Sequence, residues 1–366
     1  MSGRSDVVIV GGGVIGCASA WFLAREGVSV TLVEREDVAA QASGAAAGML
    51  LPFGETEEEG PFLEWAERSL ALFPELCAEL RERSGVDPEF EPSGALHVAA
   101  DASEASALRA RVRRLVGREL EWLEPGEARD LEPQLAPDLA GALFSPREAH
   151  VRSPLLAQAC AAAAQGLGAR IERGVSFERL RFEGGRVIGV ETSAGRRDAG
   201  AVLLCAGVWT PPALPLALPI EPVRGQILSL DNCSPPLRHL IVGGAAYLVP
   251  KRDARVVVGA TEERVGFDRR VTSAGVAALL AAAPRLVPSL ADCAFRDAWA
   301  GLRPCTPDGL PVIGRIPGSD GLLVASGHHR NGVLLAPVTA GLVTDLILGK
   351  TLPSSAAAFA PDRFAP

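Results

Sequence analysis

Three spaced glycines near the amino terminus, followed by an acid, have the residue types and the spacing to bind a nucleotide. Gly11, Gly13 and Gly16 form the pattern G-x-G-x-x-G. The first glycine permits a tight turn, the second lets the backbone approach a pyrophosphate, and the third lets a helix pack closely on a strand. Glu34 follows Gly16 by 18 residues, close to the spacing at which a carboxylate accepts hydrogen bonds from ribose hydroxyls. We therefore predict that this stretch binds NAD or FAD.

The elements that position these residues occur in the order strand, helix, strand. The apolar run Val7–Val10 ends at the first glycine, a helix is expected from about Val14, and Ser29–Val33 forms a second strand. The amino terminus of the helix would then point at the phosphates. Arg35 could meet the 2′-phosphate of NADP, but an arginine after a strand is common, so NADP is less favoured than NAD or FAD.

The rest of the chain predicts an α/β protein with two domains built from discontinuous segments. Residues 42–49 are small apart from Met49, which would let this backbone pack against a cofactor. Further helices are expected at 61–84, about 104–116, 153–166, 273–283 and 333–348. Further strands are expected at 95–99, 142–145, 169–172, 175–182, 187–191, 202–205, 226–230, 247–250, 256–260 and 322–325. The predicted domains are a Rossmann-like nucleotide-binding domain of residues 1–86, 146–220 and 300–366, and an antiparallel-sheet domain of residues 87–145 and 221–299.

Composition and charge argue against several classes of partner. Acidic residues outnumber basic ones, 44 against 36, which argues against a nucleic-acid partner and a polybasic membrane anchor. The apolar run at Val7–Val10 is too short for a signal peptide. The longest apolar segment, residues 332–348, contains Pro337 and Asp345 and is predicted to be a buried helix and not a membrane span. We expect a cytoplasmic protein with small-molecule partners.

The cysteines and histidines do not have the spacing of a structural or metal site. Seven cysteines occur at irregular intervals without a C-x-x-C pair, which is not typical of a disulfide framework or a zinc site. Five histidines, including the adjacent His328 and His329, lack the spacing of helical metal ligands. No metal is expected.

Two segments near the carboxyl terminus carry a resemblance to a known family. Residues 299–314 read W-A-G-L-R-P-C-T-P-D-G-L-P-V-I-G, and residues 327–332 read G-H-H-R-N-G. Together with the amino-terminal glycines and the small residues at 43–49, they resemble the FAD-dependent D-amino acid oxidase superfamily, most closely glycine oxidase of the thiamine pathway. The resemblance covers nearly the whole chain. It implies a D-amino acid oxidase-like fold, in which the antiparallel domain binds the substrate, and a homo-oligomer.

The resemblance also implies a reaction. FAD would accept a hydride at N5 from glycine or a related small amino acid, such as sarcosine, another N-substituted glycine or a D-amino acid. The resulting imine would hydrolyse in water, and dioxygen would be reduced to hydrogen peroxide. A planar guanidinium can hold the substrate carboxylate through two parallel hydrogen bonds, and this orientation is most of what the reaction needs.

The same resemblance assigns roles to individual residues. Arg303 would hold the substrate carboxylate, Tyr247 would be its hydroxyl partner, and Arg330 would lie nearby. The two histidines would contact the cofactor and not transfer protons, because adjacent residues on an extended loop point in opposite directions. The helix beginning near Gly332 would stabilise the negative charge of reduced flavin. The full set of expected cofactor contacts is Gly11, Gly13, Val14, Ile15, Gly16, Glu34, Arg35, Ala42, Ser43, Ala47, Gly48, Met49, Val175, Ala206, Gly207, His328, His329, Arg330, Asn331, Gly332, Val333 and Leu334.

Two positions depart from the pattern of the best-known glycine oxidases. Ala245 stands where histidine can occur, and Glu262 stands where methionine can occur, so the substrate can be larger than glycine or N-substituted. In related sarcosine oxidases a cysteine attaches the flavin covalently, and it would align near Gly301 here. Cys305 lies four residues later, so we expect non-covalent FAD.

Other functions, and purely structural roles for some of these residues, stay open. The chain could be an amine or D-amino acid dehydrogenase that passes electrons to a quinone, an RNA-modifying flavin domain, or a nucleotide-binding protein without catalysis. Net acidity argues against the RNA-binding alternative. Taken alone, Arg303 could be a surface ion-pairing residue, and Tyr247 and Met49 could be packed residues of the core.

Overall fold

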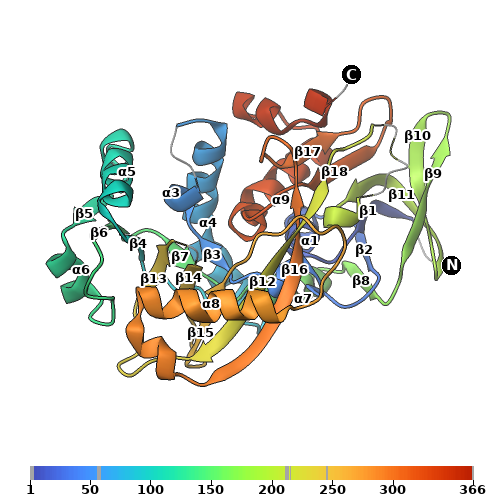
Figure 1. The fold of residues 1–366 in the computed structure, drawn as a ribbon. Helices are drawn as coiled ribbons and strands as arrows, with labels where there is room; N and C mark the ends of the chain where they lie inside the picture. The colour runs from blue at the N-terminus through green and yellow to red at the C-terminus, as the bar shows by residue number, and fades with distance from the viewer. Residues whose placement is uncertain (1–3, 56–58, 211–213, 215, 245, 365–366) are drawn as a thin grey trace.

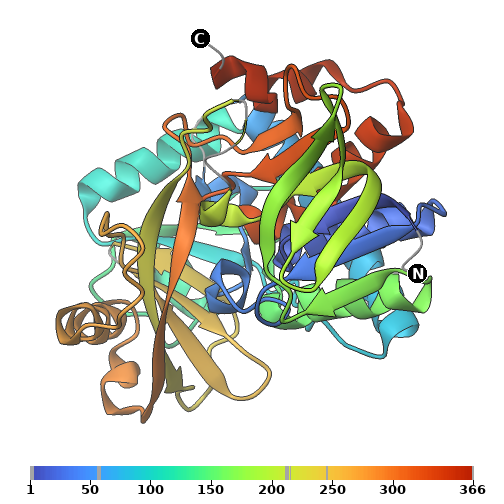
Figure 2. The same ribbon diagram turned by 90° about the vertical axis from the view of Figure 1, so that its right-hand side faces the viewer.

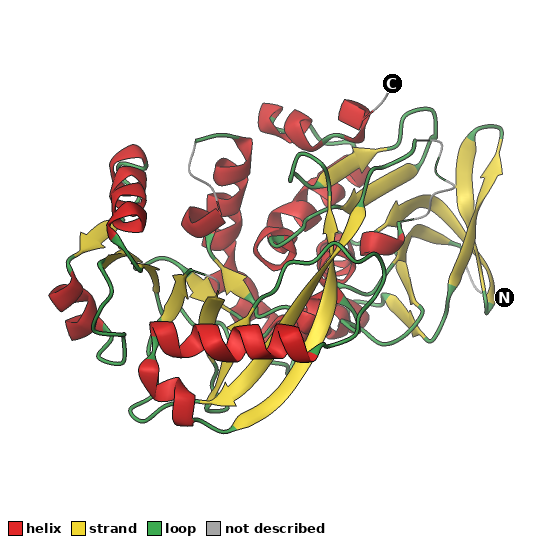
Figure 3. Ribbon diagram, viewed as in Figure 1, coloured by secondary structure: helices red, strands yellow, loops and turns green. Residues whose placement is uncertain are grey.

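Two sheets organise the part of the chain that the computed structural model describes, which comprises residues 4–55, 59–210, 214, 216–244 and 246–364. Each sheet has eight strands within these ranges. The sheets lie on opposite sides of the molecule in Figure 1, and Figure 3 shows helices concentrated around the first sheet. This mixed α/β architecture confirms the predicted fold class.

The first sheet has a parallel core, with strand order β17-β18-β11-β1-β2-β8. The strands β1 and β2 are almost continuous apolar runs, as expected for parallel strands that are covered on both faces. Strand β17 is antiparallel to β18. The bounds are β1 (Ser5–Val10), β2 (Val30–Glu34), β8 (Arg170–Arg173), β11 (Gly195–Leu204), β17 (Val312–Arg315) and β18 (Leu322–Ser326).

Four helices cover one face of this sheet and an antiparallel hairpin covers the other. The helices share a large apolar core that includes Trp21, Phe73 and Leu335. They are α1 (Val14–Arg25), α4 (Pro61–Ser84), α7 (Ser153–Gly166) and α9 (Gly332–Leu348). The hairpin of β9 (Phe177–Glu183) and β10 (Arg186–Thr192) packs on the opposite face, where Val187 and Val190 meet Val8. Figure 2 shows this hairpin, in light green, lying across the sheet.

The second sheet is antiparallel except for the pair β13 and β4, and its order is β16-β12-β15-β14-β13-β4-β6-β5. Helix α8 (Ser273–Leu286) covers one face, where Leu279 packs with Leu228 and Leu248. Helices α5 (Ala102–Arg114) and α6 (Pro125–Leu131) lie at the end formed by β4, β6 and β5. The strands are β4 (Ala95–Ala99), β5 (Glu121–Leu123), β6 (Gly141–Ser145), β12 (Glu221–Asp231), β13 (Leu240–Gly243), β14 (Ala246–Pro250), β15 (Arg255–Gly259) and β16 (Phe295–Cys305).

Short elements connect the two sheets. Strand β3 (Met49–Leu50) lies in the chain between α2 (Ala42–Ala45) and α3 (Pro52–Glu55). It pairs with β7 (Ala149–His150) to form a small two-stranded sheet. The remaining elements are short 3-10 helices, η1 (Gly207–Trp209), η2 (Pro288–Asp292), η3 (Ser354–Phe359) and η4 (Pro361–Phe364). Within the described ranges, no helix combines the length and the apolarity that a bilayer crossing requires.

Several elements differ from the sequence-based expectation. Strand β11 begins at Gly195 because its first half pairs with β10 at an exposed edge, where charged residues replace the apolar pattern. Strands β5 and β13 were not expected. Strand β16 was not expected as a strand either, and it crosses the predicted domain boundary between residues 299 and 300. The division into domains therefore stays a prediction.

Candidate cofactor and substrate site

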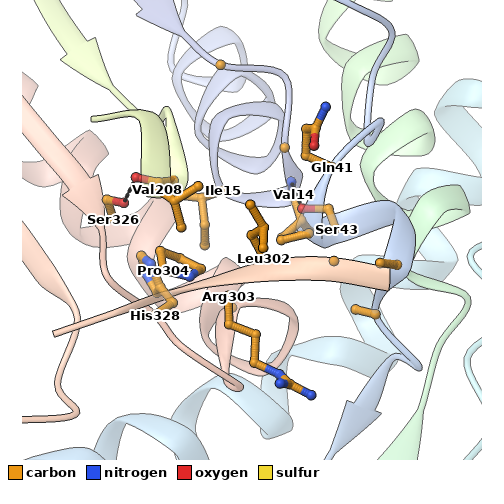
Figure 4. A pocket seen from close by; sticks show the side chains of 18 of the residues that line it. Val14, Ile15, Gln41, Ser43, Val208, Leu302, Arg303, Pro304, Ser326 and His328 are labelled. Carbon is orange, nitrogen blue, oxygen red and sulfur yellow. Dashed lines mark hydrogen bonds between the residues drawn. The ribbon is translucent and has the colours of Figure 1, made fainter. Parts of the chain in front are cut away.

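A single cavity brings together most of the residues that the sequence singled out. It begins at the carboxyl end of β1, where the glycine turn lies, and reaches the second sheet (Figure 4). The predicted residues that line it are Gly11, Gly13, Val14, Ile15, Glu34, Arg35, Ala42, Ser43, Ala47, Gly48, Met49, Ala206, Gly207, Tyr247, Arg303, His328, His329, Arg330, Asn331, Gly332 and Val333. Gly16, Val175 and Leu334 do not line the cavity.

The glycine turn has the conformation and the close packing that a phosphate-binding loop requires. Gly11 has φ +110°, and a Cβ atom there would collide with the carbonyl of Cys205. A Cβ at Gly16 would collide with the carbonyl of Gly11, so this glycine serves helix packing and not the cavity wall. The backbone N–H of Val14 donates to Ser43 Oγ at 2.9 Å. Gly13, Val14 and Ile15 line the cavity, so the amino terminus of α1 faces it beside the Ser43 hydroxyl, which fits a pyrophosphate.

The carboxylate of Glu34 is held at the end of β2. Its Oε2 accepts from the backbone N–H of Gly12 at 2.6 Å, and its Oε1 accepts from that of Glu36 at 2.9 Å. These bonds fix the acid beside the glycine turn, where a ribose would follow the pyrophosphate. The guanidinium of Arg35 lies 4.1 Å from the ring centroid of Trp209, a cavity residue that sequence reasoning missed.

Val175 and Leu334 are placed differently from the expectation. The N–H of Val175 donates to the carbonyl of Glu34 at 2.8 Å, and its side chain packs against the core under the hairpin. Ser176 and Phe177, which follow it, line the cavity instead. Leu334 is buried in the helical core because the first turn of α9 directs it away from the cavity.

The small residues at 42–49 form a wall of the cavity. Gly48 has φ +83°, and a Cβ atom there would collide with the carbonyl of Val151. The hydroxyl of Ser153 donates to the carbonyl of Ser43 at 2.6 Å, which ties the start of α7 to this wall. The segment therefore presents backbone and methyl groups to the cavity, as its composition predicts.

Strand register places Tyr247 and Arg303 on the same face of the second sheet. Tyr247 pairs with Gly259, which pairs with Ile227, and Ile227 pairs with Trp299 on β16. Directly paired residues share a face, and so do residues two or four apart on one strand. Arg303 is four residues beyond Trp299 and therefore lies on the face that carries Tyr247.

Two glycines let these long side chains lie flat on that face. A Cβ at Gly259 would collide with the ring of Tyr247, and a Cβ at Gly225 would collide with the guanidinium of Arg303. Gly225 is on β12, the neighbour of β16, and Gly259 is on β15, the neighbour of β14. The two side chains therefore lean toward each other across the sheet, into the same cavity.

A network of polar groups supports Arg303. Its Nη1 donates to the carbonyl of Thr261 at 3.1 Å. Thr261 Oγ1 accepts from the N–H of Gln226 at 2.9 Å and donates to Glu263 Oε1 at 2.6 Å. The buried Arg224 hydrogen-bonds Glu263 and lowers the pKa of that carboxyl to about 2. The loop that receives the guanidinium is thus anchored by an ionised pair.

The loop before α9 lies beside Arg303 and has unusual backbone geometry. His329 has φ +46°, and its N–H donates to the carbonyl of Pro304 at 2.8 Å. Such strained residues occur often at functional sites. The ring of His328 bonds Thr339 Oγ1 of α9 at 3.0 Å, whereas Nε2 of His329 has no hydrogen-bond partner among the described residues.

Both of these histidines are neutral at pH 7. Burial lowers the pKa of His328 to about 3. Burial also lowers the pKa of His329 to about 4, against the raising influence of the Glu262 charge, and the charges of Arg303 and Arg330 lower it further. Neither ring is poised to exchange a proton near neutral pH.

The cavity includes residues that the sequence did not single out. Some were neighbours of predicted ones, and Figure 4 shows Leu302 on the side of β16 that faces Val14 and Ile15, with Arg303 on the other side. Others, such as Ile227, carry no signal in the sequence. The additional lining residues are Val10, Val33, Gln41, Ala45, Ala46, Leu51, Ser176, Phe177, Cys205, Val208, Trp209, Gly225, Ile227, Gly301, Leu302, Pro304, Ala325 and Ser326.

Three further positions from the sequence bear on the site. Ala245 lies outside the described residues. Glu262 is exposed and does not line the cavity, but its charge acts on His329. The thiol of Cys305 donates to the carbonyl of Thr306 at 3.4 Å and lies outside the cavity wall. Among the residues described, no cluster of three or more His, Cys, Asp or Glu side chains could hold a metal ion.

Comparisons with known proteins agree with this site. A family model described as FAD dependent oxidoreductase matches residues 6–346. Glycine oxidase of Geobacillus kaustophilus is 38% identical over 371 residues, which cover 99% of this chain and 98% of that protein. Its crystal structure matches with a TM-score of 0.94 over 98% of this chain and 99% of that one. An iminodiacetate oxidase from a Chelativorans species matches with a TM-score of 0.88 and 28% identity, over 97% of this chain and 98% of that one.

A longer relative matches over part of its length. The bifunctional protein ThiO/ThiG of Trichormus variabilis is 38% identical over 349 residues, which cover 94% of this chain and 52% of that protein. The chain thus spans about half the length of this relative. These matches confirm the predicted resemblance and the predicted cofactor, FAD. The chain belongs to the family of FAD-dependent oxidoreductases.

Proposed function

We propose that this chain is an oxidase that dehydrogenates glycine or a related small amino acid and reduces dioxygen to hydrogen peroxide. The observation that carries the proposal is the convergence of Arg303 and Tyr247 in the cavity that begins at the glycine turn. A carboxylate-binding cation and a hydroxyl beside a flavin site fit a small amino acid. The similarity to two amino acid oxidases supports the same substrate class.

Each residue has a distinct task in this proposal. FAD, when bound, supplies the acceptor for the hydride that leaves the α-carbon. Arg303 holds the substrate carboxylate through parallel hydrogen bonds, and the hydroxyl of Tyr247 donates a hydrogen bond to the same carboxylate. The network behind Thr261 keeps the guanidinium in place. Together they fix the α-carbon in one orientation, which is the main requirement of the reaction.

The protein does not need a strong base in this scheme. The substrate amine is neutral when the hydride leaves, and the imine then hydrolyses in water. The neutral rings of His328 and His329 fit cofactor contact and not proton transfer. Gly332 and Val333 bring the amino terminus of α9 to the cavity, where its positive end would stabilise negative charge.

The remaining assignments are part of the proposal. We expect FAD to be bound without a covalent link, because Cys305 does not line the cavity. Arg330 is a second cation at the cavity wall and would help to attract the substrate. A cytoplasmic location and a homo-oligomeric state are expectations from the family resemblance. The similarity to an iminodiacetate oxidase favours a second candidate substrate class, N-substituted glycines.

Anaerobic mixing tests the function directly. The yellow holoenzyme is mixed with glycine, sarcosine, iminodiacetate and D-alanine, and bleaching of the flavin absorbance is followed before air is admitted. We expect bleaching by glycine or an N-substituted glycine, then peroxide on reoxidation. No bleaching by any of these amines would contradict the proposal. Bleaching with dye reduction but negligible peroxide would identify a dehydrogenase instead.

A further inference from the structure

Lys251 lies where the second sheet meets the wall formed by residues 42–49. The chain contains only two lysines, Lys251 and Lys350. Lys350 is half-exposed, and its ammonium is 3.4 Å from Glu26 and 3.5 Å from Asp345. Lys251 follows the last residue of β14, four positions after Tyr247, and its ammonium points into the protein.

The ammonium of Lys251 has three neighbours that can accept a hydrogen bond. It donates to the carbonyl of Ala47 at 2.7 Å and to that of Val151 at 3.0 Å. Nδ1 of His150 lies 3.4 Å away. Burial lowers the pKa of His150 to about 2, so its ring is neutral and Nδ1 can accept a hydrogen bond from the ammonium. Burial lowers the pKa of Lys251 to about 7, and below that pH its ammonium has three protons to donate, which matches this set of acceptors.

These acceptors belong to two segments that are already packed tightly together. Met49 pairs with His150 in the β3–β7 sheet, and the N–H of Val151 donates to the carbonyl of Gly48 at 2.9 Å. Gly48 has φ +83° and no room for a Cβ atom. Lys251 thus joins a third segment, the end of β14, to both strands behind the cavity wall.

We propose that Lys251 is a positioning residue that fixes Ala47, Gly48 and Met49 against the flavin and couples this wall to the strand that carries Tyr247. The inference rests on the proposed assignment of these three residues to the flavin side of the cavity. Methionine at 251 would leave two carbonyls without their donor. Arginine would keep the charge but present a planar fork in place of three tetrahedral donors.

The first test uses the scarcity of lysine. Native holoenzyme is treated with formaldehyde and cyanoborohydride, which methylate accessible amines, and peptides are then analysed by mass spectrometry. We expect rapid methylation of Lys350 and none of Lys251 until the protein is unfolded. Methylation of Lys251 at the rate of Lys350 would overturn the inference. This result does not depend on the substrate, so it separates the inference from the proposed function.

The second test measures the effect on the cofactor. For Lys251→Met we expect FAD binding about tenfold weaker, as befits a lost charge-assisted hydrogen bond, and a shifted visible spectrum of the flavin that remains bound. Lys251→Arg should recover part of both, and Lys350→Met should match the parent. Parental FAD affinity and spectrum in Lys251→Met would overturn the positioning role. A parent that binds FAD but is bleached by no amino acid would contradict the proposed function alone.

Discussion

The cofactor end and the substrate end of the cavity are built in different ways. At the cofactor end, the glycine turn and Glu34 come from one continuous unit of β1, α1 and β2. At the substrate end, Arg303 and Tyr247 stand on β16 and β14, which β12 and β15 separate in the sheet. The first end depends on backbone conformation at a few consecutive positions. The second depends on the register of four strands.

This difference predicts that the two ends fail separately. A change in the glycine turn or at Glu34 should weaken FAD binding and leave the substrate face assembled. A change on the face that carries Arg303 should leave the protein yellow and impair its reaction. The four predictions below test this separation, beginning with the largest expected effect.

Arg303→Ala should nearly abolish turnover of amines that bear a carboxylate. Truncating one partner of a buried charge pair costs roughly 2–5 kcal/mol, or about 30-fold to several-thousandfold in kcat/KM if the interaction persists in the transition state. Rates of flavin reduction with glycine, sarcosine and a D-amino acid would be compared in parent, Arg303→Ala and Arg303→Lys. Lysine should rescue only in part, because it cannot form the two-pronged contact.

The control for this prediction is Arg264→Ala, which removes an exposed guanidinium that pairs with Glu221 on the surface. It should reduce the flavin at the parental rate. FAD content should be equal in all variants. Near-parental reduction by Arg303→Ala would remove Arg303 from the substrate site and make Arg330 the next candidate.

Glu34→Ala should weaken FAD binding and spare the fold. The lost charge-assisted hydrogen bond corresponds to roughly 1.5–3 kcal/mol, or about tenfold or more in the dissociation constant. Glu34→Gln would keep an acceptor for the N–H of Gly12 without the charge, and so separates the ribose contact from the turn contact. Glu36→Ala is the neighbouring control. Titration of apoprotein with FAD gives the dissociation constants. Equal dissociation constants for Glu34→Ala and the parent would show that Glu34 does not contact the cofactor and only stabilises the glycine turn.

The sequence predicted more of the cofactor end than of the substrate end. Gly11, Gly16 and the bounds of α4 could be predicted because turns, close packing and helix ends depend on neighbouring residues. Ile227 and Trp209 could not, since an apolar residue on a strand or after a turn gives no signal of the cavity it will face. The roles of Arg303 and Tyr247 came from family resemblance alone.

The misplaced elements have two causes. The strand β13 pairs with β4, which is distant in the sequence. The first half of β11 pairs locally with β10 as a hairpin, but its exposed, charged residues lack the apolar pattern of a strand. Val175 was expected among the cofactor contacts, and the residues after it, Ser176 and Phe177, line the cavity. Long-range pairing is the information that one sequence read locally does not contain.

Gly225→Ala should impair the substrate end by displacing the Arg303 side chain. The new methyl group would occupy the place of the Arg303 guanidinium, and such overpacking costs roughly 1–3 kcal/mol, or about 5-fold to 150-fold in kcat/KM. FAD affinity should stay parental. Gly126→Ala is the matched control, because a Cβ atom there would meet nothing within 4 Å. Steady-state kinetics give kcat/KM for both variants. A parental kcat/KM in Gly225→Ala would show that the guanidinium does not lie over this glycine.

His328 gives the smallest effect and concerns the loop that connects the two ends. Its pKa is lowered by burial from 6.5 to about 3 in the folded protein, so the unfolded chain binds a proton that the folded chain excludes. The free energy of unfolding should therefore be highest above pH 6.5 and fall as the pH drops, by a few tenths to about 1 kcal/mol between pH 7 and pH 6 for this residue. His328→Gln keeps a partner for Thr339 but cannot titrate, so its loss of stability over this interval should be smaller by that amount. Urea denaturation of parent and variant at both pH values measures the difference. Equal losses in the two proteins would mean that the ring at 328 is not held buried and neutral in the folded protein.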